Sequence, residues 1–173
     1  EEVVMGSPEA VDIDASIDLQ NNDSTKDFVK RVIANAIDMG ASDIHFEMTG
    51  SNCRIRYRID GLLRDMYKPF RAEIAPYLNR VVKATAGMNI AETRIPLDGR
   101  VRVGFKNRGI DLRIATCPVE AGSGMNTNDY EKCVIRILDS GTAPTRLEEI
   151  IWNLDQRELM KRMIDAPYGT IVV

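Results

Sequence analysis

The residues of this chain best suited to chemistry are arginines that recur between Arg94 and Ala115. A guanidinium group is planar and permanently charged, and its geometry matches that of phosphate and carboxylate groups. In this stretch apolar and charged residues alternate on both sides of Lys106-Asn107-Arg108-Gly109, a segment with the composition of a turn. The pattern predicts a β-hairpin that carries arginines on one face.

The period of two along each strand predicts how this hairpin pairs. We expect Phe105 to lie opposite Ile110, so that the apolar side chains of both strands share one buried face. In that register Arg102 lies directly opposite Arg113, and Arg100 lies on the diagonal. Like charges that face each other destabilise a sheet by up to about 1 kcal/mol. The cluster therefore fits either an anion bound over it or arginines that extend into screening solvent.

A second group with chemical potential consists of alternate residues of one predicted strand: Asp43, His45 and Glu47. Carboxylates and imidazole bind metals, so one hypothesis is a metal hydrolase. If Met48 pairs with Cys53 in the returning strand, however, these residues face three arginines: Arg54, Arg56 and Arg58. Three arginines repel a divalent cation, which favours charge pairs within the sheet over a metal site. No Ser or Cys nucleophile accompanies the histidine in a recognisable triad.

The composition is ordinary for a soluble globular protein, and the charge argues against nucleic acid as a binding partner. The chain has 173 residues, of which 44% are hydrophobic and 28% charged, and its net charge is -3. Its sequence pI is about 5.3, whereas proteins that coat nucleic acid usually have a high pI. No apolar run approaches the roughly 20 residues that cross a bilayer; we expect a cytoplasmic protein that binds no nucleic acid. The widely spaced Cys53, Cys117 and Cys133 are typical of small core residues.

Helix and strand signals surround the arginine hairpin. One helix is expected to begin with Ser24 as its cap and to end at Gly40, and a second to begin near Pro76 and end at Gly87. Each carries a single apolar stripe, which indicates packing against the core. Two further strands and a Gly-rich loop are expected at residues 62–67, 130–138 and 120–129, respectively.

The two ends of the chain differ from this middle part. Residues 1–23 are acidic and irregular, as in a linker. Residues 140–144 are rich in helix and strand breakers and predict a domain boundary. Beyond it we expect a short helix around residues 146–152, a second helix capped near Asp155, and a strand in the β-branched run 170–173. We therefore expect the sequence to end within a second domain.

Five motifs occur in the same order in a known family. They are Ala-Ser-Asp-Ile-His-Phe-Glu at 41–47, Arg-Tyr-Arg-Ile-Asp-Gly-Leu at 56–62, Arg-Ile-Pro-Leu-Asp-Gly-Arg at 94–100, Asp-Leu-Arg-Ile-Ala-Thr at 111–116 with Pro118, and Glu-Lys at 131–132 through Arg136 to Leu138. With this set, the chain resembles the domain before the motor in the hexameric type II secretion and type IV pilus extension ATPases. It departs from the family at 94–100, where Arg-Arg-x-Pro-Gln-Asp-Gly-Arg is usual.

The resemblance implies an α+β fold: a PAS-like, mostly antiparallel sheet flanked by helices, plus the truncated start of a RecA-like α/β motor domain. It implies a linker at 1–23, a PAS-like N2-type domain at 24–139, and a linker with the first motor elements at 140–173, before the Walker A loop. The parent protein would hydrolyse ATP with Mg. This part, without a Walker A loop, would be inactive alone.

The resemblance also implies site residues and partners. In the family this domain reaches over the nucleotide and contacts its phosphates through arginines, which correspond here to Arg100 and Arg113, with Arg94 and Arg102 as further nucleotide-binding candidates. The implied partners are sister subunits of a homo-hexamer and inner-membrane platform or assembly proteins of a secretion or pilus machine. The implied location is cytoplasmic and peripheral to the inner membrane. The alternative is a PAS-like regulatory module that binds a small ligand.

Overall fold

A computed structural model describes residues 22–49, 52–119, 130–139, 146–151 and 153–172. Contacts divide the chain into two units, residues 1–138 and 139–173. Residues 1–21 of the predicted linker at 1–23, the loop at 120–129 and the boundary at 140–144 lie outside the described residues, and residues 22 and 23 belong to a helix. The residues of the candidate site all lie in the first unit.

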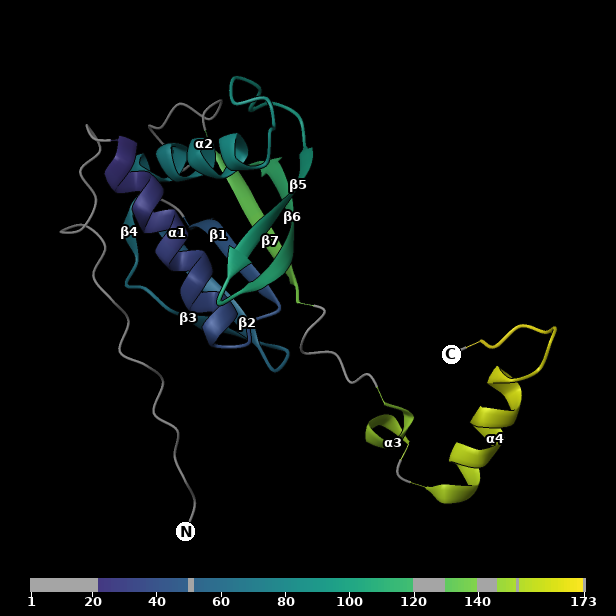
Figure 1. Ribbon diagram of the computed structural model, residues 1–173. Helices are drawn as coiled ribbons and strands as arrows, with labels where there is room; N and C mark the ends of the chain where they lie inside the picture. Colours follow the sequence, from purple (N-terminus) through teal and green to yellow (C-terminus); the bar gives the residue numbers. More distant parts are fainter. Residues whose placement is uncertain (1–21, 50–51, 120–129, 140–145, 152, 173) are drawn as a thin grey trace, which may run out of the picture. The chain divides into compact units, whose positions relative to one another are not determined.

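The first unit is built on one antiparallel sheet of seven strands. Their bounds are Asp43–Thr49 (β1), Asn52–Ile59 (β2), Leu62–Asp65 (β3), Phe70–Arg71 (β4), Leu97–Phe105 (β5), Arg108–Pro118 (β6) and Glu131–Leu138 (β7). The order across the sheet is β3-β2-β1-β7-β6-β5, and β4 pairs with β2 (Figure 1). The predicted α+β fold with an antiparallel sheet is thus confirmed.

Two helices, α1 (Asn22–Asp38) and α2 (Ala75–Thr85), cover one face of this sheet, and a short 3-10 helix, η1 (Ala72–Ile74), leads into α2. Figure 1 shows α1 crossing in front of the strands. The apolar stripes of both helices and the facing strands supply fully buried side chains, among them Val32, Leu78, Ile44, Tyr57, Leu112 and Ile135. Burying a side chain of this size contributes about 1.5–3 kcal/mol. The core therefore lies between the helices and the sheet, and the other face of the sheet is left for charged residues.

Local sequence signals predict the first part of the unit well. The β1–β2 hairpin has the predicted register, with Met48 opposite Cys53. Helix α1 begins at Asn22 rather than Ser24 and is followed by Gly40, as expected. Gly40 has a φ of 67°, a left-handed conformation that costs glycine little and that commonly ends helices.

The register predicted for the arginine hairpin is wrong by two residues. Phe105 lies opposite Arg108 rather than Ile110, because the turn consists only of Lys106 and Asn107. Both turn residues have positive φ, 45° and 65°, as in the two-residue turns whose twist matches that of the flanking strands. Strand pairing therefore resumes within the predicted turn, and this changes which arginines face each other.

The second unit contains two helices and no strand among its described residues. The N-cap of the longer helix is Asn153, whose Oδ1 accepts a hydrogen bond from the backbone N of Gln156 at 3.1 Å; the predicted cap near Asp155 lies inside the helix. The predicted strand is wrong for residues 170–172, because a β-branched run forms a strand only beside a pairing partner. The helices are α3 (Leu147–Ile150), shorter than predicted, and α4 (Leu154–Ile164). None of the described helices is long and apolar enough to span a membrane.

Candidate functional site

The face of the sheet turned away from α1 and α2 carries most of the charged residues of the strands; Glu131, which faces the core, is an exception. Side chains alternate between the two faces along each strand, and burial alternates accordingly along β5 and β6. Arg100 and Arg113 are exposed on this outer face. Cys117 shares it and is exposed, so its predicted burial is wrong, whereas Cys53 and Cys133 face the core and are buried as predicted.

Four arginines and one aspartate form a continuous row across five strands of the outer face. Asp43 on β1 lies opposite both Arg58 on β2 and Arg136 on β7. Arg136 in turn lies opposite Arg113 on β6, which faces Arg100 on β5. We call these five residues the arginine row. Adjacent strands lie about 4.8 Å apart, so neighbouring guanidiniums of the row are within reach of one ligand.

The inner end of the arginine row, formed by Arg58 on β2 and Arg136 on β7, is neutralised by Asp43 on β1 between them. Its Oδ1 accepts a hydrogen bond from Nε of Arg136 at 3.0 Å, and its Oδ2 lies 3.3 Å from Nε of Arg58. Oδ2 also accepts a hydrogen bond from Oγ of Ser42 at 2.8 Å. Burial by itself would raise the pKa of Asp43, but the bonds from Arg136 and Ser42 hold that pKa below its ordinary value of 3.8.

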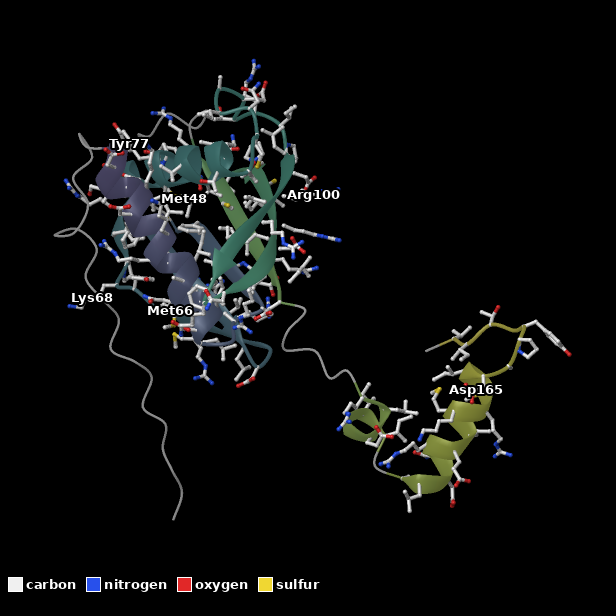
Figure 2. The ribbon with its side chains drawn as sticks, viewed as in Figure 1. Met48, Met66, Lys68, Tyr77, Arg100 and Asp165 are labelled. Carbon is white, nitrogen blue, oxygen red and sulfur yellow. The ribbon has the colours of Figure 1, made fainter. Side chains whose placement is uncertain are left out.

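The outer end of the arginine row, formed by Arg113 on β6 and Arg100 on β5, lacks such neutralisation. Arg100 and Arg113 line a groove of about 630 Å³ together with Arg136, and among the described residues that line it Asp98 is the only acidic one. Among the described residues, neither Arg100 nor Arg113 forms an ion pair or a side-chain hydrogen bond. Figure 2 labels Arg100 beside β5, on the side away from α1. A groove in which guanidiniums outnumber carboxylates three to one is suited to an anion with several oxygens.

The structure separates Arg94 and Arg102 from this groove. Arg94 precedes β5 and binds Glu92 through Nη2 and Nε, at 2.9 and 3.1 Å. These hydrogen bonds lower the pKa of Glu92 to about 2. Arg102 lies opposite Asp111 rather than Arg113, with 3.9 Å between Nε and Oδ1. Of the four predicted arginines, Arg100 and Arg113 line this groove, and Arg102 lines a smaller hollow of about 410 Å³ with the same two arginines and Asp111.

Arg136 belongs to the fifth sequence motif, but its place beside the groove is visible only in the structure. Its strand, β7, shows the expected alternation, which places Arg136 on the polar side together with Lys132. The sequence does not reveal that β7 inserts between β1 and β6, because these pairings join distant segments of the chain. That insertion sets Arg136 beside Arg113 on one side and Asp43 on the other.

The carboxylates of the predicted metal triad are bound by cationic side chains. Oε2 of Glu47 accepts a hydrogen bond from Nε of Arg56 at 2.9 Å, and its Oε1 lies 3.3 Å from Nζ of Lys132. Burial would raise the pKa of Glu47, but Arg56 and Lys132 hold it below its ordinary value of 4.5. Charge pairing with the neighbouring strands is thus confirmed for Asp43 and Glu47. No cluster of His, Cys, Asp or Glu that could hold a metal ion occurs in the described ranges.

His45 lies between Asp43 and Glu47 on β1, but the hydrogen-bonding capacity of its ring nitrogens is not satisfied. It is 8% exposed, and its Nδ1 is 3.5 Å from Oε1 of Glu47. Neither ring nitrogen has a hydrogen-bond partner among the described residues. Burial lowers the pKa of His45 below its ordinary value of 6.5, although the nearby Glu47 opposes this effect.

We expect the stability of this unit to fall in two stages as the pH decreases from neutrality. Because the folded-state pKa of His45 lies below 6.5, the unfolded chain takes up a proton first and stability is lost below that pH. Asp43 and Glu47 have lowered folded-state pKa values, so their stabilisation is lost as the pH falls below about 4.5.

Urea unfolding at a series of pH values measures both stages. His45→Gln should remove the first stage and leave the second. Equal slopes of the unfolding free energy between pH 7 and pH 5 in the wild type and in this variant would contradict the assignment to His45.

Comparisons with known proteins identify the family. The profile of the Type II/IV secretion system protein family matches residues 18–173. The type IV pilus assembly ATPase PilB of Pseudomonas aeruginosa is 36% identical over 147 residues, which cover 84% of this chain and 24% of PilB. The type II secretion system ATPase E of Vibrio cholerae is 33% identical over 145 residues, which cover 84% of this chain and 27% of that protein.

A third relative extends the match. The putative type II secretion system protein E of Escherichia coli K12 is 33% identical over 162 residues, which cover 92% of this chain and 31% of the relative. The chain thus spans about a quarter to a third of the length of the curated relatives it matches. The predicted family is confirmed by these matches: the chain belongs to the Type II/IV secretion system protein family.

Proposed function

We propose that this domain acts as a phosphate clamp in an ATP-hydrolysing motor for type II secretion or type IV pilus assembly. In this role Arg100 and Arg113 contact the phosphates of an ATP molecule. A motor domain elsewhere in the longer protein binds this ATP together with Mg. The observation that carries the proposal is the outer end of the arginine row, where two guanidiniums face each other without a carboxylate partner among the described residues.

The arrangement favours an anion for a physical reason. Directly opposed like charges destabilise a sheet by up to about 1 kcal/mol, and a bound phosphate would turn this repulsion into attraction. The arginines lie on paired strands over a packed core, so their backbone positions are fixed before the anion arrives. Guanidiniums held in this way can stabilise the charge that develops on a transferring γ-phosphoryl group.

The proposal includes the setting in which the clamp works. We place the domain in a homo-hexameric ring on the cytoplasmic side of the inner membrane, bound to platform or assembly proteins of a secretion or pilus machine. The names of the relatives, a pilus assembly ATPase and a secretion ATPase, support this setting. Arg94 and Arg102 have carboxylate neighbours and serve in the proposal as supporting charges beside the nucleotide site.

A second candidate function is the binding of a small apolar ligand. A groove of about 810 Å³ lies between α1, α2 and β5, and its lining includes Val29, Ile33, Val81, Ile90 and Phe105. This groove favours the alternative of a regulatory module. It predicts that an apolar dye such as ANS binds the native protein at one site and that Ile33→Arg abolishes this binding. Native protein that leaves the dye unbound would exclude this alternative.

The clamp can be tested on the chain itself. Tripolyphosphate should bind at low salt, as measured by isothermal titration calorimetry, and the affinity should fall as salt is added. Arg100→Ala and Arg113→Ala should each weaken binding about tenfold, the effect of losing one charge-assisted hydrogen bond. Arg31→Ala, on the exposed side of α1, is the matched control and should bind as the wild type does.

Two results would overturn the clamp. Binding that Arg100→Ala and Arg113→Ala leave unchanged would exclude these residues as phosphate contacts. Release of phosphate from ATP by the 173-residue chain alone would show that it carries a catalytic site of its own, which the proposal does not allow.

A further inference from the structure

Arg136 lies where a third phosphate contact would be. It occupies β7, which is paired on both sides, and it faces Arg113 directly. It lines the same groove as Arg100 and Arg113, and 66% of its side chain is exposed. Three adjacent strands therefore each present one guanidinium to the groove, over about 10 Å of sheet.

Arg136 can leave its ion pair with Asp43 and bind another partner, because Asp43 has other polar partners. The hydrogen bond uses Nε of Arg136 and Oδ1 of Asp43, at 3.0 Å. The other carboxylate oxygen of Asp43 is engaged by Ser42 and lies 3.3 Å from Nε of Arg58. If Arg136 turned towards the groove, Asp43 would keep these two partners and would not become an unpaired buried charge.

Resting on the proposed function, we infer that Arg136 is a third phosphate-contacting residue of the clamp and that Asp43 is the positioning residue that restrains it. The ligand class is a polyphosphate chain, because three guanidiniums spaced along the row can contact several phosphoryl groups at once. Asp43 thus competes with the polyphosphate for Arg136 and sets the affinity of the site.

Tripolyphosphate titration of the chain at low salt tests this inference. Arg136→Gln should weaken binding about tenfold. Arg136→Lys keeps the charge but loses the paired N–H donors of the guanidinium, and it should weaken binding less. Asp43→Asn should tighten binding about threefold or more, because it removes the competing charge. In the R136Q background, Asp43→Asn should lose most of this effect, since Asp43 acts through Arg136. Urea unfolding of each variant confirms that the chain is folded.

The outcomes separate this inference from the clamp. If Arg136→Gln binds tripolyphosphate as Arg31→Ala does while Arg100→Ala and Arg113→Ala lose affinity, the clamp stands and the role of Arg136 is wrong. If Asp43→Asn tightens binding equally with and without Arg136→Gln, the restraint by Asp43 is wrong. If the wild type does not bind tripolyphosphate, the clamp fails and this inference fails with it.

Discussion

In the motor protein proposed above, Arg113→Ala is expected to lower kcat for ATP hydrolysis about a thousandfold. The estimate follows from arginines that stabilise charge on a transferring phosphoryl group, whose removal costs about 10³–10⁵ in kcat. Because Arg113 contacts the phosphates in the ground state and stabilises further charge in the transition state, kcat should fall and KM should rise by up to about tenfold, so that kcat/KM falls further than kcat. Steady-state phosphate release measures both. Arg100→Ala should behave similarly, because Arg100 faces Arg113 in the same groove.

Matched variants separate this effect from a general loss of charge or of folding. Arg31→Ala removes one exposed arginine from α1 and should leave kcat unchanged. Arg113→Lys should recover only part of the activity, since an ammonium group cannot make the two parallel bonds of a guanidinium. A kcat within threefold of the wild type for both Arg113→Ala and Arg100→Ala, in correctly assembled protein, would contradict the clamp.

Lys83→Met is expected to destabilise the first unit by about 3–5 kcal/mol, the usual cost of breaking a buried ion pair on one side. The side chain of Lys83 is fully buried in α2, and its Nζ lies 2.6 Å from Oε2 of Glu131 on β7. The same Nζ donates a hydrogen bond to the carbonyl oxygen of Glu92 at 2.6 Å. Without Lys83, the carboxylate of Glu131 would stay buried without its cation. Urea unfolding at pH 7 measures the loss.

The double variant K83M/E131L provides the control. If the cost of Lys83→Met comes from the uncompensated carboxylate, replacing both partners by apolar residues should restore most of the lost stability. A double variant as unstable as Lys83→Met would instead show that Lys83 acts mainly through its bond to Glu92. Asn79→Ala, which removes the hydrogen bond from Asn79 to the Glu131 carbonyl, should cost about 1–3 kcal/mol.

Local patterns predict one hairpin correctly and the other incorrectly, for different physical reasons. In β1 and β2 both faces constrain the register, because acidic residues must meet arginines on one side while apolar residues meet on the other. In β5 and β6 charged residues occupy the outer face in any register that keeps the apolar face intact. The register then depends on the turn: Asn107 is a residue type that tolerates positive φ, but the positive φ of Lys106 is not evident from its residue type.

The parts of the site that the sequence does not reveal depend on long-range pairing. Arg100 and Arg113 can be found from their motifs, but the position of Arg136 depends on the insertion of β7 between β1 and β6. The ion pair of Lys83 outside the site also depends on long-range pairing, because Lys83 lies on the buried side of α2 and its partner Glu131 lies 48 residues later, on β7. The one local signal is that Asn79 and Lys83, four positions apart, interrupt an otherwise apolar stripe. Polar residues at that spacing on a core-facing stripe indicate a buried partner.

A structure of the proposed motor protein with a non-hydrolysable ATP analogue and Mg tests the clamp most directly. The measured quantity is the distance from the guanidinium nitrogens of Arg100 and Arg113 to the nearest phosphate oxygen. We predict hydrogen-bond distances, about 2.7–3.2 Å, in at least one subunit of the ring. Guanidiniums of both residues that lie more than about 8 Å from every phosphate oxygen in all subunits, beyond the reach of one bridging water, would contradict the clamp.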